Sequence, residues 1–467
     1  MGPPMIIAIM GCGILLTVRS KFFVFRYFGL IFGKTLGSMK SSGQKRAGKV
    51  SPFEAICVAV GVGSLGGVAA AIAVGGPGAL FWILAWAAFG MTVKVAEVSL
   101  ACHYRCTDSH GNYYGGPSYY IERGLGEQKG FKGAKVLAWC FGIAFLLAAF
   151  SSNQVFTIAE ALNATFHIPM IPFACVYSLF VFYITWKGVP RIASFASKLV
   201  PFMCLLYFVG GIVLIAVNFR ALPGVIQAVF HDAFTGSTAA GGFVGAGVMT
   251  VIRTGIARSI NSNEAGQGSS PMIHAAADTP HPVEQGLWGA IEVFVSTVLV
   301  STITALAILS TGTWTSGLTS VTLTITAFQS VFGQIGLYFI GIIAFLFSIT
   351  TTTGWFTYYC SLIAHGFRHN EKLRDRLILI FKIIFPWPNI IVVALIVLSG
   401  KGPNLYWAMI DVVTVLPTFF NVIALIGLSG VFIRLLNDYK ARYLGVGTVD
   451  PNFHIFYEDE AHDKSKD

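Results

Sequence analysis

Glycines are concentrated within one long apolar stretch of this 467-residue chain. Four of them fall within seven residues, namely Gly61, Gly63, Gly66 and Gly67. Glycine weakens the interior of a helix, and in hydrocarbon the freed backbone groups are tolerated only where they face protein or line a cavity. A helix interrupted here would expose N–H groups that suit a carboxylate and C=O groups that suit a small cation. The alternative is a face of small residues for close helix packing.

Four consecutive threonines, Thr350–Thr353, occur in another apolar stretch. In one interpretation each hydroxyl donates to the backbone of its own helix. In the other, Thr350 and Thr351 direct oxygen atoms toward a cation, and Na⁺ is a hard ion that accepts neutral oxygens. A carrier coupled to protons needs a carboxylate at mid-span instead. Most candidates lie near predicted span ends, so Na⁺ is favoured. These candidates are Glu54, Glu97, Glu160, Glu292 and Asp411.

A polar run interrupts a third apolar stretch. Arg253, Gly255 and Arg258 precede the polar segment Asn261–Pro271, which indicates a second discontinuity in a helix. Alternatively, the two arginines extend toward the membrane interface or form ion pairs, and Glu264 is a possible partner for Arg258.

Two further polar pairs lie inside apolar stretches. Asn153 and Gln154 carry amides that must bond either another helix or a polar ligand when they are buried. Lys94 and Glu97 are three residues apart, the spacing of neighbours on a helix surface, and we expect them to form a structural ion pair.

The composition defines the elements that must hold these residues. Hydrophobic residues make up 55% of the chain and charged residues 11%, against about 25% charged in a typical soluble protein. This excludes a soluble globular enzyme, a disordered chain and a disulfide-built secreted domain, and it leaves a helical membrane protein with many spans. The segment 219–238 is expected to be an amphipathic surface helix, and 312–335 an extracellular cap. Long apolar runs predict eleven spans, at 3–19, 52–74, 78–102, 136–161, 169–186, 195–218, 239–260, 286–310, 336–365, 376–400 and 405–434.

Basic residues predict the orientation of these spans. The net charge is +10, and Lys and Arg concentrate in alternate connections, at 19–50, 105–135, 187–198, 368–376 and after residue 434. The positive-inside rule then puts the N-terminus outside and the C-terminus in the cytoplasm. The positive charge is therefore a topology signal, and no nucleic-acid partner is expected. With no outer-membrane or organelle signal, the predicted location is the lipid bilayer of a bacterial inner membrane.

Cysteines and catalytic motifs indicate neither a metal centre nor an enzyme. Six of the eight cysteines stand alone in apolar stretches, where they are expected to be small buried hydrophobes. Cys102 and Cys106 have His103 and His110 nearby but no second pair of ligands. The chain has no His-Glu-x-x-His and no Gly-x-Ser-x-Gly motif. We therefore expect no enzymatic activity and no organic cofactor, and the sequence carries no signal of oligomeric state.

Two interrupted helices five spans apart are typical of a transporter built from inverted repeats. The predicted organisation is an extra N-terminal helix and basic linker at 1–50, a first five-helix repeat at 51–218, a second five-helix repeat at 219–434, and a cytoplasmic tail at 435–467 with a disordered end.

Several motifs resemble those of the sodium:alanine (alanine/glycine:cation) symporter family. They run in order and include Gly75–Trp82, Gly115–Ile121, Ser262–Ser269 and His274–Ala277. The resemblance implies an all-α membrane protein of the leucine-transporter type. Its eleven transmembrane helices would form a five-plus-five inverted repeat with one extra N-terminal helix. It also implies sodium-coupled uptake of a small neutral amino acid, typically alanine or glycine, by alternating access.

The resemblance further implies the residues of a substrate site. Backbone N–H groups at Val62 and Gly63 would hold the substrate carboxylate. A break in the seventh span, near Arg253–Ala257, would offer carbonyls to the substrate amine. The full set on the substrate side is Val62, Gly63, Ser64, Gln154, Thr254, Gly255 and Trp355.

A sodium site is implied in the same way. The carbonyls of Cys57 and Val60, with the hydroxyls of Thr350 and Thr351, would bind the co-transported Na⁺. The chain departs from the family pattern nearby, because Gly61-Val62-Gly63-Ser64 stands where Gly-Thr-Gly-Asn is usual. Phe156, Ser296 and Cys360 also replace polar or acidic family residues. These losses leave open a larger or more apolar amino acid, and coupling to protons is a second alternative.

Overall fold

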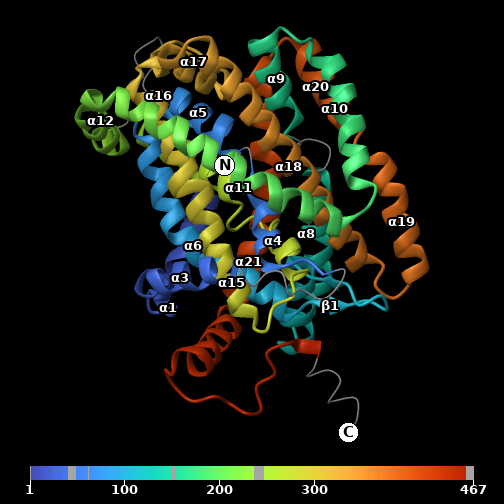
Figure 1. The fold of residues 1–467 in the computed structure, drawn as a ribbon. Coiled ribbons are helices and arrows are strands. Elements are labelled where there is room, and N and C mark those ends of the chain that lie inside the picture. The colour runs from blue at the N-terminus through green and yellow to red at the C-terminus, as the bar shows by residue number, and fades with distance from the viewer. Residues whose placement is uncertain (1, 40–48, 62, 149–153, 236–246, 459–467) are drawn as a thin grey trace.

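The computed structural model is almost entirely helical (Figure 1). It describes residues 2–39, 49–61, 63–148, 154–235 and 247–458. The only strands in those ranges are β1, Cys106–Thr107, and β2, Tyr113–Tyr114, which pair antiparallel as a short hairpin. Among the described residues, seven helical stretches are long and apolar enough to cross a membrane, and five shorter apolar helices accompany them. The helical membrane protein is thus confirmed, while the count of eleven spans, the five-plus-five repeat and the four-part organisation stay predictions.

The helices of the N-terminal half follow the predicted spans closely. The predicted span 136–161 corresponds to two helices, α8 and α9, and Asn153 lies outside the described residues between them. The bounds are α1 Pro3–Arg19, α2 Phe23–Arg26, α3 Phe28–Met39, α4 Pro52–Ala59, α5 Gly63–Gly75, α6 Ala79–His103, α7 Pro117–Tyr120, the π-helix η2 Ile121–Gln128, α8 Ala134–Ala148, α9 Val155–Phe166, α10 Met170–Thr185 and α11 Val189–Val217.

The C-terminal half contains the long helices α18 and α21. A π-helical stretch, η4, joins α15 to α16 into one continuous run from Pro282 to Ser310. The bounds are η3 Phe219–Ala221, α12 Leu222–Thr235, α13 Val248–Asn263, α14 Pro271–Ala275, α15 Pro282–Val293, η4 Phe294–Ser301, α16 Thr302–Ser310, η5 Thr313–Thr315, α17 Ser320–Phe332, α18 Gln334–Gly366, α19 Glu371–Ile384, α20 Pro388–Ser399 and α21 Gly402–Leu444.

Two connecting segments are helical. The predicted surface helix is present as α12, which lies at the edge of the molecule (Figure 1) and exposes Phe230 and Phe234. The segment 312–335, predicted as a cap, contains α17, and this helix packs into the interior. Val321 and Leu323 are buried, and the Thr324 hydroxyl donates to the Leu65 carbonyl at 3.1 Å. Tertiary packing therefore orders this segment as a buried helix, and its role as an extracellular cap stays a prediction.

Helices from both halves of the chain interleave around α4 and α5. Helix α13 packs along α5 and α6, α15 packs along α6, and α18 contacts α4, α9, α11 and α17. The β hairpin and the C-terminal residues lie at one end of the molecule, and α17 lies at the opposite end (Figure 1). We call the first of these the hairpin end.

Part of the predicted tail is ordered against the hairpin. Helix α21 continues to Leu444, beyond the predicted boundary at residue 434. Further along, the Glu458 carboxylate accepts hydrogen bonds from the Thr107 N–H at 2.9 Å and the Thr107 hydroxyl at 2.7 Å. The Phe456 ring lies 4.5 Å from the Arg105 guanidinium. The expected disordered end, residues 459–467, lies outside the described residues.

Candidate functional site

The second predicted span is interrupted where its glycines are concentrated. Helix α4 begins with a capping box between Ser51 and Glu54 and ends at Ala59, and α5 begins at Gly63. Val60 is extended, with φ −72° and ψ 115°. The last carbonyls of α4 and the first N–H groups of α5 lack partners within their own helices, so opposite partial charges meet at this gap. Val62 lies outside the described residues.

Two other helices approach this gap closely enough to require glycine. A Cβ atom on Gly63 would lie 2.6 Å from the backbone oxygen of Asn261 in α13. A Cβ atom on Gly354 of α18 would lie 2.6 Å from the Val58 oxygen. A Cβ atom on Gly61 would lie 3.4 Å from the side chain of Thr351. The structure therefore brings α4, α5, α13 and α18 together at the interruption.

A second interruption exists, but it is not where we predicted it. Helix α13 runs unbroken through Arg253–Ala257 and ends at Asn263. Glu264 then has a left-handed backbone with φ 55°, and Gly266 and Gly268 have φ values of 88° and 82°. Helix α14 begins only at Pro271. The prediction of a break near Arg253–Ala257 is therefore wrong by about seven residues.

Thr254 and Gly255 serve helix packing instead. A Cβ atom on Gly255 would lie 2.7 Å from Cβ of Trp82 and 2.8 Å from the Ala79 oxygen, so this glycine permits close contact between α13 and α6. The Thr254 hydroxyl donates to the Thr250 carbonyl at 2.8 Å. It faces Gly75, at the far end of α5 from the gap, about 18 Å away along the helix. Both residues therefore lie away from the gap between α4 and α5.

The predicted sodium ligands lie at the end of α4 and on α18, which packs against the gap. Cys57 is in the last turn of α4, and Val60 follows it. The Thr351 hydroxyl donates to the Phe347 carbonyl at 2.7 Å, and the Thr350 hydroxyl donates to the same carbonyl at 3.0 Å. A hydroxyl that donates its proton to the helix keeps lone pairs for a cation. Thr351 is the one of the two that faces Gly61.

Gln154 and Trp355 are both bonded to other parts of the protein. Gln154 is buried beside α9, where its side-chain oxygen accepts from the Tyr406 hydroxyl at 3.3 Å. This agrees with the interpretation that the amide bonds another helix. The Trp355 indole N–H donates to Glu264 at 3.1 Å, and its ring stacks on Phe145 with a centroid distance of 5.4 Å. Trp355 thus connects α18 to the second interruption.

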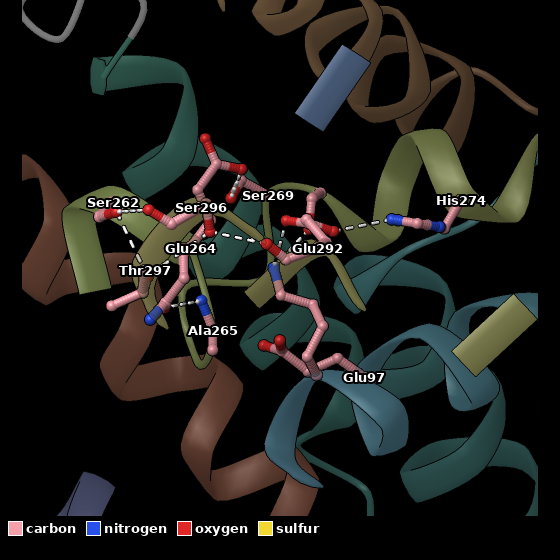
Figure 2. A network of polar contacts seen from close by, with 12 residues as sticks. Glu97, Ser262, Glu264, Ala265, Ser269, His274, Glu292, Ser296 and Thr297 are labelled. Carbon is pink, nitrogen blue, oxygen red and sulfur yellow. Dashed lines mark hydrogen bonds and ion pairs between the residues drawn. The ribbon is translucent and has the colours of Figure 1, made fainter. Parts of the chain in front are cut away.

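Ser64 belongs to a cluster of hydroxyls that the sequence did not reveal. Its hydroxyl lies 2.6 Å from that of Ser262 and donates to the Ser296 carbonyl at 2.8 Å. The Ser262 hydroxyl lies 3.3 Å from the Thr297 hydroxyl (Figure 2). It also lies 3.1 Å from the Ser301 hydroxyl. Three of these residues are on the π-helix η4, and such insertions often occur at functional sites. Nothing in the sequence signals a π-helix, so this cluster was missed.

Two predicted ion pairs have different partners in the structure. Arg258 pairs with Asp411 of α21 at 2.7 Å, and not with Glu264. Lys94 pairs with Glu292 at 3.2 Å, and not with Glu97. In both cases the partner comes from a distant part of the chain, which a local spacing rule does not detect.

Buried carboxylates are also more central than the sequence suggested. Glu97 and Glu292 are fully buried. Glu292 is the eleventh residue of its 29-residue helical run, about 15 Å from the beginning of that run. The expectation that such residues sit near span ends does not hold for Glu292.

A cavity of about 180 Å³ opens at the hairpin end. It lies between the beginning of α4, α14, α18 and the hairpin, and its lining includes Val50, Met272, Phe356, Thr357 and Tyr113. Its lining therefore comes from both halves of the chain.

Comparisons with known proteins agree with this architecture. The family model described as the sodium:alanine symporter family matches residues 1–453. The chain is 32% identical to a sodium/alanine symporter, AgcS, of Methanococcus maripaludis, over 92% of this chain and 93% of that protein. It is 34% identical to a probable sodium/glutamine symporter, GlnT, of Bacillus subtilis, over 97% and 90%.

Solved structures share the fold at low sequence identity. A manganese transporter of Eremococcus coleocola has a TM-score of 0.52 at 14% identity, covering 86% of this chain and 81% of that one. A Na⁺-coupled sialic acid symporter has a TM-score of 0.50 at 12% identity, covering 92% and 98%. These likenesses concern the fold alone. From the match over nearly its whole length, the chain belongs to the sodium:alanine symporter family, which consists of membrane transporters and not enzymes.

Proposed function

We propose that this protein takes up a small neutral amino acid together with Na⁺ by alternating access. The observation that carries the proposal is the gap between α4 and α5, which places a helix C-terminus and a helix N-terminus at one point inside the protein. A zwitterion and a cation each cost several kcal/mol to desolvate alone, and opposite helix ends offer partners for both. Membership of the family supports the same assignment.

The substrate carboxylate is proposed to bind N–H groups at the beginning of α5, where Gly63 is the first residue. Val62, the other residue of this prediction, lies outside the described residues. The backbone and side-chain oxygens of Asn261 approach Gly63 from α13, and they are suitable acceptors for the substrate amine. Asn261 therefore replaces Thr254 and Gly255 in the proposal. Trp355 would enclose the substrate from α18. Gln154 and Ser64 would contribute indirectly, by positioning the residues to which they are hydrogen-bonded.

The sodium ion is proposed to bind between α4 and α18. Its ligands would be the carbonyls of Cys57 and Val60 and the hydroxyls of Thr350 and Thr351, with Thr351 best placed because it faces Gly61. A membrane potential contributes about 2.3 kcal/mol per charge per 100 mV to inward movement of the ion. The transporter is proposed to lie in a bacterial inner membrane with its N-terminus outside and its hairpin end in the cytoplasm.

Uptake of radiolabelled amino acids into proteoliposomes tests the function. We expect saturable uptake of alanine or glycine with a Na⁺ gradient, and none when choline replaces Na⁺. Uptake that persists in choline but requires an acidic exterior would support coupling to protons instead. Uptake of glutamine or another larger amino acid in place of alanine would support the alternative of a larger substrate. Glutamine is the amino acid to test first because the GlnT relative is named as a probable sodium/glutamine symporter.

Two matched substitutions test the sodium site. Thr351→Val removes a hydroxyl that faces the gap, whereas Thr353→Val removes one that donates to the Ile349 carbonyl at 2.7 Å. Both threonines are buried on the same helix. We expect Thr351→Val to lower the apparent Na⁺ affinity at least tenfold, equivalent to about 1.4 kcal/mol, and Thr353→Val to leave it within twofold. Equal effects of the two substitutions would refute the assignment.

A further inference from the structure

A buried cluster of charged side chains adjoins the second interruption and has no part in the proposed uptake. Figure 2 shows three of its carboxyls, Glu97 of α6, Glu264 at the interruption and Glu292 of α15. Their exposed fractions are 0%, 5% and 1%. The ammonium of Lys94, which is fully buried, lies within the same cluster.

Glu292 is fully compensated within the cluster. The Lys94 ammonium donates to one of its oxygens at 3.2 Å and to the Ser270 hydroxyl at 2.5 Å. His274 Nε2 lies 2.9 Å from the other oxygen, and the Gln285 amide nitrogen lies 2.7 Å from His274 Nδ1. When the amide donates to Nδ1, Nε2 is the ring nitrogen that donates to Glu292. This arrangement holds Glu292 as the ionised partner of Lys94.

The other two carboxyls, Glu264 and Glu97, also feel the positive charge of Lys94, but they differ in their hydrogen bonds. Glu264 accepts from the Ser269 hydroxyl at 2.5 Å, from Trp355 at 3.1 Å and from the Tyr358 hydroxyl at 3.3 Å. Three donors stabilise the ionised form of a carboxyl.

Glu97 has fewer hydrogen-bond donors than Glu264. One of its oxygens accepts from the Asn421 amide at 2.5 Å, and the backbone of Gly266 is a second donor to this carboxyl. Its other oxygen has no hydrogen-bond partner in the part of the chain that the structure describes. An ionised carboxylate with one oxygen left unpaired in the interior is the costliest arrangement of the three.

The charges of the cluster do not balance if every carboxyl is ionised. Three carboxylates and one ammonium would leave two uncompensated negative charges inside the protein, and buried groups in that position take up a proton instead. Within the described residues, the positive group that acts on Glu97 is Lys94 of the same helix, which is already paired with Glu292. The titratable groups that act on it from α1 and α7 are Cys12 and Tyr120, and Glu292 of α15 adds negative charge.

We propose that Glu97 is a proton-binding site whose carboxyl carries a proton at neutral pH, while Glu264 and Glu292 are ionised. The ligand is the proton itself, and the site is formed by α6, by Asn421 of α21 and by the loop at Gly266, whose carbonyl accepts from the same Asn421 amide at 2.8 Å. The site therefore connects the second interruption to α21. It is independent of the proposed sodium coupling.

Infrared spectroscopy of the purified full-length protein in lipid nanodiscs tests this site directly, because the C=O stretch of a protonated carboxyl is separate from that of a carboxylate. At neutral pH the difference spectrum of wild type minus Glu97→Gln should contain a protonated-carboxyl band that shifts in D₂O. The matched control is Glu54→Gln, since glutamine also completes a capping box with Ser51, and its difference spectrum should lack that band.

Each outcome decides the proposal. A band that survives Glu97→Gln but disappears in Glu264→Gln would overturn the assignment, as would the absence of any such band. Should Glu97→Gln fail to fold, Glu97→Asp keeps a carboxyl with a different stretching frequency, and an unshifted band would then overturn the proposal. Raising the pH should remove the band from the wild type. The measurement needs no transport, so its failure leaves the proposed uptake untouched, and the reverse also holds.

Discussion

Replacing Gly354 by alanine should separate α18 from α4 and weaken Na⁺ binding. The added Cβ would lie 2.6 Å from the Val58 oxygen and 3.0 Å from a Val58 methyl group, where ordinary contacts begin at 3.4 Å. The two helices must therefore move apart by roughly 0.8 Å, the difference between 3.4 Å and 2.6 Å. Overpacking of this kind costs about 1–3 kcal/mol. Alanine in place of a helical glycine returns up to about 1 kcal/mol, so a net loss of stability is expected.

The Na⁺ dependence is the sharper readout of this substitution. Thr351 lies one turn before Gly354 in α18, so the same displacement moves its hydroxyl away from the gap. We expect the apparent Na⁺ affinity for uptake to fall at least tenfold, about 1.4 kcal/mol. Gly430→Ala, in α21, is the matched control because a Cβ there meets nothing within 4 Å. It should raise thermal stability slightly and leave Na⁺ dependence unchanged. Wild-type Na⁺ dependence in Gly354→Ala would refute the reasoning.

Three further predictions concern groups outside the gap. Burial lowers the pKa of His281 from 6.5 to about 4, so the unfolded chain binds a proton first as the pH falls. Stability should therefore decline between pH 6.5 and 4, by about 3 kcal/mol at 1.36 kcal/mol per pH unit, and thermal unfolding of His281→Asn should show a flatter pH profile. The Arg258–Asp411 pair, with Arg258 nearly buried, should give a coupling energy above about 1 kcal/mol in a double-mutant cycle. Glu458→Ala removes two hydrogen bonds to Thr107, each contributing about 0.5–1.5 kcal/mol, and limited proteolysis should cleave this tail faster than in the wild type.

Glycine explains both a correct and a wrong prediction of the interruptions. Near Gly61 and Gly63 the helix does break. At Gly255 the helix is continuous. The absence of a side chain there instead lets Trp82 and Ala79 of the neighbouring helix approach closely. A glycine in an apolar helix permits either a break or a close approach, and composition alone does not distinguish them. The polar residues after Asn261 were the better indication, since they cannot be left in hydrocarbon without partners.

Charged partners could not be predicted for a different reason. Lys94 and Glu97 have the spacing of an ion pair on a helix surface, yet Lys94 bonds Glu292, which is 198 residues away. Local spacing determines which side chains share a face of one helix, but the partner across a helix interface depends on how α15 packs on α6. The same limit hid the cluster of hydroxyls around Ser262, to which the π-helix η4 contributes the side chains of Thr297 and Ser301 and the carbonyl of Ser296.

The two proposed ligands use one gap, and this has an energetic consequence for coupling. The end of α4 would bind Na⁺ and the beginning of α5 would bind the amino acid, with Gly61 of the connecting segment held close to Thr351. Whichever ligand binds first restrains the ends of both helices, and the second then binds helix ends that are already restrained. Coupling between ion and amino acid would therefore arise without direct contact between them. Thermodynamic linkage requires the effect to be reciprocal, so Na⁺ must raise amino-acid affinity by the same factor as the amino acid raises Na⁺ affinity.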